Sequence, residues 1–109
     1  MIHLNFKSLL DSIYMMSLGY ELQKKSLPSY VIVADEVISD FENSFLLMPQ
    51  IVDNEMISFK NIALILELYN KTQWCLRNLG MDDFDNDEWN LVREMAKNTS
   101  EQLMKDSRL

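Results

Sequence analysis

Turn-forming residues are scarce in this chain, because glycine and proline each occur only twice in 109 residues. A β-sandwich or β-barrel joins many short strands, and its turns need such residues at regular intervals. Long helices need few of these breaks. The composition, 48% hydrophobic and 25% charged, is otherwise that of an ordinary globular protein. We therefore expect an all-α fold, with residues 1–109 forming a single domain.

Apolar residues recur at spacings of three and four along the first half of the chain, as in helices with one buried face. This pattern predicts a first helix over residues 5–24, with Gly19 weakening its last turn. The stretch 26–29 contains a proline, which a first helical turn tolerates, and a second helix is expected from there to about Met48. Pro49 should then stop it. The expected core face of the second helix comprises Tyr30, Val33, Ala34, Val37, Phe41, Phe45 and Met48.

Residues 50–57 are expected to lead into a third helix, with either Asp53 or Ser58 as its N-cap. This third helix runs to Leu79 and is apolar on almost all sides. Such a pattern predicts a central helix that several neighbours cover. Gly80 follows at the position where a left-handed residue commonly ends a helix.

A fourth helix is predicted after the acidic segment 81–88. Asp85 and Glu88 are three residues apart, as the two polar residues of a capping box are. The expected inner face of this helix comprises Trp89, Val92, Met95, Ala96, Thr99 and Leu103. Four helices with short connections predict an antiparallel bundle.

The net charge of −7 bears on the kind of partner. Phosphate contacts depend on lysine and arginine, so we expect neither direct nucleic-acid binding nor attachment to an anionic membrane. An acidic surface favours basic protein partners and speeds encounter with them. It also keeps a protein soluble whether or not a partner exists, and composition leaves both interpretations open.

Cys75 is the only cysteine, which allows neither an intramolecular disulfide nor a cysteine-based zinc site. Its place on the apolar third helix predicts a buried, unreactive thiol. Residues 1–24 lack a basic stretch before an uninterrupted apolar run, because Asp11 and Glu21 divide the apolar sequence. No segment approaches the roughly 20 apolar residues that span a bilayer. We therefore expect a cytoplasmic protein.

Four carboxylates have the spacing of a calcium-binding EF-hand loop at its first, third, fifth and twelfth positions: Asp83, Asp85, Asp87 and Glu94. The sixth position, which needs glycine for a sharp turn, is Glu88. Trp89 and Val92 also begin the helical spacing too early for such a loop. We favour an acidic helix start stabilised by the helix dipole, with no metal or cofactor, while calcium binding stays open.

No group of residues has the spacing of a catalytic site. The sole histidine, His3, lies near the chain terminus with no nucleophile beside it in the pattern. Adjacent acids such as Asp35 and Glu36 diverge on a helix and suit a solvated face better than acid–base catalysis. We expect a protein that is not an enzyme.

The first candidate partner-binding region is the stretch between Lys25 and Lys60, which has no basic residue. Its acidic residues are Asp35, Glu36, Asp40, Glu42, Asp53 and Glu55. On the second predicted helix, a strip opposite the core face comprises Ile32, Asp35, Ser39, Glu42 and Leu46. Acids between two outward apolar residues are typical of a protein-binding face. A helix buried on two sides, or a homodimer, accounts for the same pattern.

The second candidate region comprises Asp82, Asp83, Phe84, Asp85, Asp87 and Glu88, and Trp89 follows it. Aromatic residues among acids are typical of a binding hot spot for a basic partner. The two regions together supply the candidate partner-binding residues.

A small, acidic, helical, cytoplasmic domain without an enzyme site resembles the bacterial immunity proteins of contact-dependent growth inhibition and other polymorphic toxin systems. The resemblance spans the whole chain in size, charge and helicity, and no diagnostic motif contributes to it. It implies capture of one cognate toxin domain, often a basic nuclease, by acidic residues that occupy the toxin's phosphate-binding surface. The alternative is an acidic chaperone or adaptor that holds a helical or basic segment of a secreted or regulatory protein.

Overall fold

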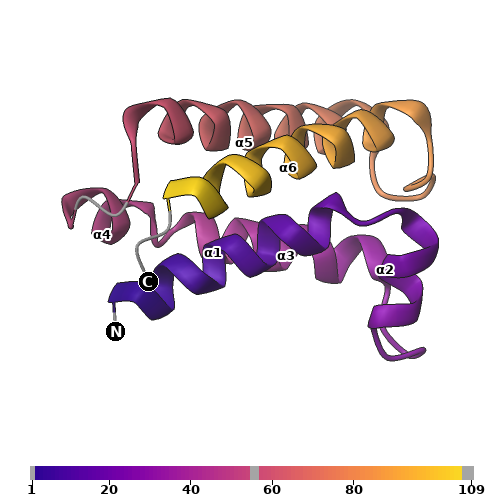
Figure 1. The fold of residues 1–109 in the computed structure, drawn as a ribbon. Helices are drawn as coiled ribbons and strands as arrows, with labels where there is room; N and C mark the ends of the chain where they lie inside the picture. Colours follow the sequence, from indigo (N-terminus) through magenta and orange to yellow (C-terminus); the bar gives the residue numbers. More distant parts are fainter. Residues whose placement is uncertain (1, 55–56, 107–109) are drawn as a thin grey trace.

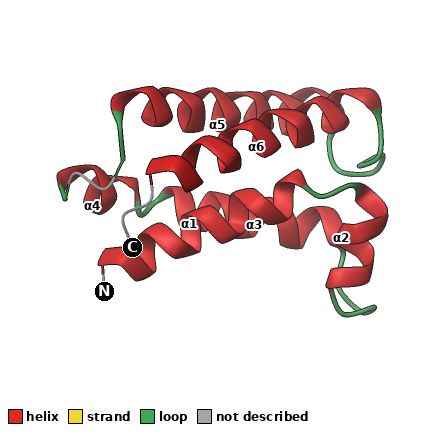
Figure 2. Cartoon of the chain, viewed as in Figure 1, coloured by secondary structure: helices red, strands yellow, loops and turns green. Residues whose placement is uncertain are grey.

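The computed structural model of the chain describes residues 2–54 and 57–106, apart from the side chains of residues 2 and 3. Within these ranges the chain forms helices and no strand (Figures 1 and 2). The six helices of this part are α1 (Ile2–Ser17), α2 (Tyr20–Ser26), α3 (Val33–Phe45), α4 (Met48–Asp53), α5 (Phe59–Leu79) and α6 (Asp87–Asp106). The all-α prediction is confirmed, although the described helices number six and not four.

The long helices form two layers, with α5 beside α6 in one and α1 beside α3 in the other (Figure 1). α1 packs extensively against both α6 and α3 and also contacts α4, so it is the central helix. The prediction that α5 would be central is wrong, because Phe59, Leu66 and Trp74 on this helix are exposed. The sequence of a helix shows how much of its surface is apolar, but it does not show whether another helix covers that surface.

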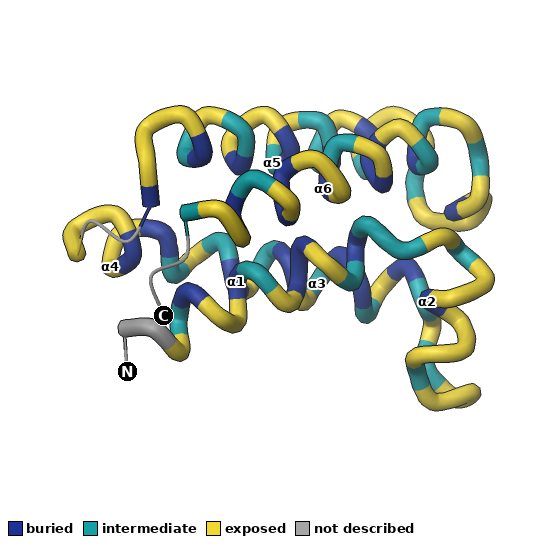
Figure 3. Tube along the Cα trace, viewed as in Figure 1, coloured by how far each residue is buried: buried dark blue, intermediate teal, exposed yellow. Residues whose placement is uncertain are grey.

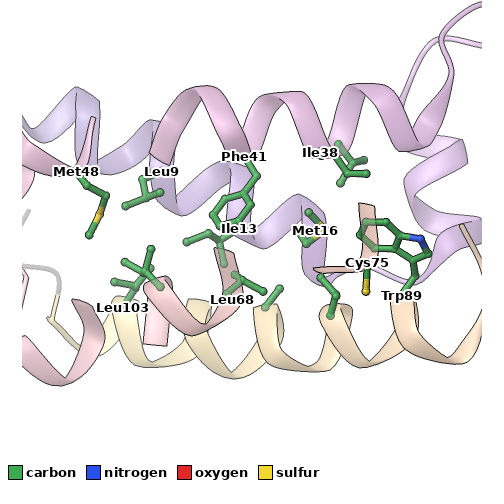
Figure 4. Close-up of a cluster of buried hydrophobic side chains, with 14 of the residues drawn as sticks. Leu9, Ile13, Met16, Ile38, Phe41, Met48, Leu68, Cys75, Trp89 and Leu103 are labelled. Carbon is green, nitrogen blue, oxygen red and sulfur yellow. The ribbon is translucent and has the colours of Figure 1, made fainter. Parts of the chain in front are cut away.

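The core lies between the two layers, where the buried stretches of the long helices face one another (Figure 3). Figure 4 shows part of it, with Trp89 and Cys75 at one end and Met48 and Leu103 at the other. The predicted inner face of α6 is confirmed, because all its members are buried except Met95, which is half-buried. Each fully buried side chain of leucine size contributes about 1.5 to 3 kcal/mol to stability.

The first predicted helix is in fact two helices, α1 and α2, separated at Gly19. This residue is the N-cap of α2 and has an extended backbone with φ −60° and ψ 154°. The fully buried side chain of Gln23 on α2 donates hydrogen bonds through Nε2 to the carbonyl oxygens of Met15 (3.0 Å) and Met16 (3.3 Å). These bonds satisfy carbonyl groups at the end of α1, which the helix itself leaves without partners. The chain therefore breaks at Gly19 where the sequence predicted only a weakened turn.

The second predicted helix is too long at both ends. Pro28 lies in the loop before α3, and Tyr30 is 86% exposed, so neither its helical nor its core assignment holds. At the other end α3 stops at Phe45, before the proline that was expected to stop it. Pro49 instead occupies the first turn of α4, where its missing N–H group has no partner to lose.

Two predicted helix boundaries are confirmed on α5. Of the two proposed N-caps, Ser58 is the one used, because its hydroxyl oxygen accepts a hydrogen bond from the backbone N–H of Asn61 at 3.3 Å. Asp53 is the last residue of α4. Gly80 ends α5 with φ 69°, in the left-handed region that glycine adopts without a steric cost.

The capping box predicted for α6 is wrong. Asn86 caps this helix, because its Oδ1 accepts a hydrogen bond from the backbone N–H of Trp89 at 2.9 Å. Glu88 does not reach back along the chain towards Asp85. Its carboxylate pairs with Lys71 of α5 at 2.6 Å, and this ion pair ties the start of α6 to α5.

Candidate protein-binding surface

The strip predicted on the second helix lies on the outer side of α3. Ile32 and Leu46 are 71% and 72% exposed, and Asp35 between them is also exposed. Ser39 and Glu42 are half-buried. The opposite side of the helix carries its buried residues Ala34, Val37, Ile38, Phe41 and Ser44. The chain thus leaves Ile32, Asp35 and Leu46 of this acidic strip open and partly covers Ser39 and Glu42.

The carboxylates of α3 take part in none of the salt bridges among the described residues. No described lysine or arginine forms a salt bridge with any acidic residue of α3, because the ion pairs of the described residues are Lys7–Asp11, Lys24–Glu21 and Lys71–Glu88. Glu42 accepts a hydrogen bond from the neutral Gln73 side chain of α5 at 2.7 Å, which positions its carboxylate without neutralising it. The outer face of α3 therefore presents carboxylates that no described lysine or arginine neutralises through a salt bridge.

An apolar groove begins where the acidic strip ends, at Leu46. It consists of two adjoining hollows of about 440 and 540 Å³ that share Val52 and Ile62. The first is lined by Phe45, Leu46, Met48, Pro49, Val52, Ile62 and Leu66, and the second by Val52, Ile57, Ser58, Phe59 and Ile62. Of the lining residues that the structure describes, only Ser58 is polar. We refer to this set as the apolar groove.

The exposure of the groove residues is large for apolar side chains. Phe59 is 89% exposed, and Leu66, two helical turns further along α5, is 46% exposed. Contiguous exposed apolar residues of this kind mark interaction surfaces in soluble proteins. Sequence reasoning missed the groove, although its signal was present in the excess of apolar residues around the third predicted helix.

The second candidate region does not form the predicted hot spot. Phe84 is only 5% exposed, and Trp89 is fully buried. Their rings contact each other edge to face, with the ring centroids 4.9 Å apart. The indole Nε1 of Trp89 also donates a hydrogen bond to the carbonyl oxygen of Gly80 at 3.0 Å. Both aromatic residues belong to the core, so Phe84 is not retained as a partner contact. Asp82, Asp83, Asp85 and Asp87 remain exposed, and Glu88 is half-buried.

The predicted calcium pattern does not converge on a site. α6 begins at Asp87, so Asp87 and Glu94 both lie on a helix and not in a loop. Among the described residues, no group of three or more acidic, histidine or cysteine side chains is arranged to hold a metal ion. Glu55 and the side chain of His3 lie outside what the structure describes.

Arg93 is a buried charged residue that the sequence reasoning did not single out. Its Nη2 donates to Oε1 of Gln23 and its Nη1 to Oδ1 of Asn90, each at 2.9 Å. The guanidinium lies over the ring of Phe84, with 4.5 Å from Cζ to the centroid. Burial lowers the pKa of Arg93 from its ordinary value, and the charge of Asp85 opposes this effect. Because Arg93 is one turn from both Trp89 and Ala96, its place on the inner face was readable from helical spacing.

The predicted burial of Cys75 is confirmed, because its side chain has no exposed surface. Burial raises the pKa of the thiol, while the nearby charge of Lys71 lowers it and that of Glu88 raises it. The thiol is thus kept protonated and shielded, and we assign it no role in binding.

Comparison with known proteins identifies no relative: no family model matches the sequence, and searches of curated proteins and of solved structures found no match. Separately, none of the described helices combines the length and the apolar character needed to cross a membrane. The function is therefore inferred from the chemistry of the surface.

Proposed function

We propose that this protein is a binding inhibitor, an immunity protein that neutralises a basic toxin domain by covering it with the outer face of α3. One observation carries the proposal: carboxylates that form no salt bridge with a described base lie on this face between the exposed side chains of Ile32 and Leu46. The thirteen residues of α3 separate these two, which places them about 21 Å apart along the helix axis. A standard protein interface buries about 800 Å² on each partner, which a strip of this length and its flanks would fit.

Inhibition of this kind requires no chemistry from the chain itself. Nucleases hold their substrates through lysine and arginine contacts to phosphates. Carboxylates presented along a rigid helix would occupy the same basic side chains and exclude the substrate. The negative field of these carboxylates would also raise the association rate, because it extends over a Debye length of about 8 Å at physiological salt. The proposal therefore involves no cofactor and no metal.

A chaperone or adaptor is the second candidate, and the apolar groove favours it. A toxin domain is folded and need not insert anything into a groove, whereas a chaperone holds a segment whose own apolar side would otherwise be exposed. The two candidates share a basic protein partner and differ in whether that partner is inhibited.

The test uses the product of the reading frame next to the gene, expressed alone and together with this chain. We expect the product to arrest growth when expressed alone, and the chain to restore growth and to bind it. Replacing Asp35 and Glu42 by lysine should lower the association rate at least about tenfold at low salt. Each replacement adds two positive charges, so the double variant changes the net charge from −7 to −3.

The matched control replaces Asp87 and Glu94 by lysine on α6. This pair is also seven residues apart, also begins in the first turn of a helix, and changes the net charge equally. We expect its association rate to fall much less. Equal slowing by both variants would mean that only net charge matters, and greater slowing by the α6 pair would assign binding to the second acidic region. Failure of the chain to restore growth would contradict the immunity proposal itself.

A further inference from the structure

The apolar groove restricts the conformation of whatever fills it. All of its described lining residues except Ser58 are apolar, and they belong to helices, to the turn between α3 and α4, or to the residues just before α5. An extended segment would bring unpaired backbone N–H and C=O groups into this groove. Such segments normally pair with the edge of a sheet, but the described residues include no strand. A helix satisfies its own backbone hydrogen bonds and can be buried here without that cost.

The lining residues also match the repeat of a helix. On α5 the groove is formed by Phe59, Ile62 and Leu66, which recur at helical spacing and span about 10 Å along the axis. An amphipathic helix presents anchor side chains at the same spacing. The two adjoining hollows would then receive successive anchors from one helix.

The charged residues around the apolar groove indicate what kind of helix can bind there. Glu42 is half-buried on α3, one turn before Leu46 at the C-cap, and Asp53 is exposed beside Val52 at the end of α4. Lys60, the nearest base along the chain, lies on α5 about 100° around the axis from Phe59 and about 160° from Ile62. A second copy of this chain would bring another net charge of −7 to the same acidic border. A helix with lysine or arginine beside its apolar face would complement that border.

We propose that the apolar groove receives one basic amphipathic helix of a protein partner. The apolar side of this helix fills the groove, and its basic flank faces the acidic strip of α3. This inference rests on the proposed protein-binding function of the same surface and adds the structure of the bound segment. It applies to an inhibited toxin and to a chaperone client alike.

The test uses three designed peptides of 18 residues, titrated into the ¹⁵N-labelled full chain and followed by NMR. The first has leucines at spacings of three and four with lysines elsewhere. In the second, glutamates replace the lysines, and in the third, the leucines and lysines alternate so that only an extended segment is amphipathic. We expect the first peptide to bind most tightly, with shifts along α3, α4 and the first half of α5.

Two matched variants locate the contact. Leu66→Asn changes a groove residue that is 46% exposed, and Leu91→Asn changes a residue on α6 that is 43% exposed. We expect Leu66→Asn to weaken binding at least about tenfold, or ~1.4 kcal/mol, and Leu91→Asn to change it less than about twofold. If Leu66→Asn lowers the melting temperature, Leu46→Asn, at a 72% exposed groove residue, replaces it.

Several results would overturn this inference. Equal binding of the acidic or the alternating peptide would remove the requirement for a basic helix, and shifts outside the groove would place the contact elsewhere. Self-association of the chain that Leu66→Asn abolishes would make a second copy the occupant. Growth protection without binding of the first peptide would refute the groove proposal alone, and peptide binding without growth protection would refute the immunity proposal alone.

Discussion

Replacement of Trp89 gives the most direct test of the fold. Its ring is fully buried, contacts Phe84, and donates a hydrogen bond to Gly80. Truncation of a core aromatic residue costs about 3 to 5 kcal/mol, and the lost hydrogen bond adds about 0.5 to 1.5 kcal/mol. Domains of this size are stable by only about 5 to 15 kcal/mol, so Trp89→Ala should leave the chain barely folded.

Trp89→Phe is the measurable version of this change. It removes the hydrogen bond and one ring of the indole, which together should cost about 2 kcal/mol. The free energy of unfolding is obtained from urea titrations followed by far-ultraviolet circular dichroism. Trp74→Phe is the control, because Trp74 is 41% exposed and Lys71 lies over its ring. This control should cost less than about 0.5 kcal/mol. Equal destabilisation by the two variants would show that Trp89 is not the core residue described above.

Two further predictions concern Cys75 and calcium. The pKa of the Cys75 thiol is raised in the folded state, so above the ordinary thiol pKa of about 8.5 the unfolded chain loses a proton that the native chain keeps. The free energy of unfolding should therefore decrease between pH 8 and pH 10 more steeply for the native sequence than for Cys75→Ala. A thiol reagent should react with Cys75 at pH 8 only after denaturation. Parallel pH profiles of the two proteins, or rapid labelling of the native protein, would refute the shielding of the thiol. Millimolar calcium should leave the melting temperature unchanged, whereas a saturable increase that Asp83→Ala abolishes would restore the calcium interpretation.

The acidic strip of α3 was predictable because exposure along a single helix follows its own periodicity. Once Val37 and Phe41 are assigned to the core, Asp35 and Leu46 must lie away from it. The apolar groove was not predictable in the same way. It forms where α3, α4 and α5 meet, and no one segment determines that meeting point.

The aromatic residues of the second acidic region were misassigned for a related reason. Acids on both sides of Phe84 indicate a solvated segment, but the loop between α5 and α6 folds back so that the ring covers Arg93. A side chain that alternates with exposed acids in sequence can still be buried, because loop residues follow no fixed period. The core position of Trp89, by contrast, was correctly predicted from helical spacing with Val92 and Ala96.

The sequence by itself determined the all-α class, the buried faces of α3 and α6, and the ends of α5 at Ser58 and Gly80. These features depend on the repeat of the helix and on hydrogen bonds between residues close in the chain, which a linear pattern contains. Only the tertiary structure decided that the chain breaks at Gly19, that α1 is central, and that Arg93 of α6 donates a hydrogen bond to Gln23 of α2. The break at Gly19 depends on the Gln23 side chain, which folds back onto the end of α1. The other two features depend on contacts between segments far apart in sequence. The apolar pattern of α5 specified a surface that favours burial, but the packing of the other helices decided which part of it stayed open for a partner.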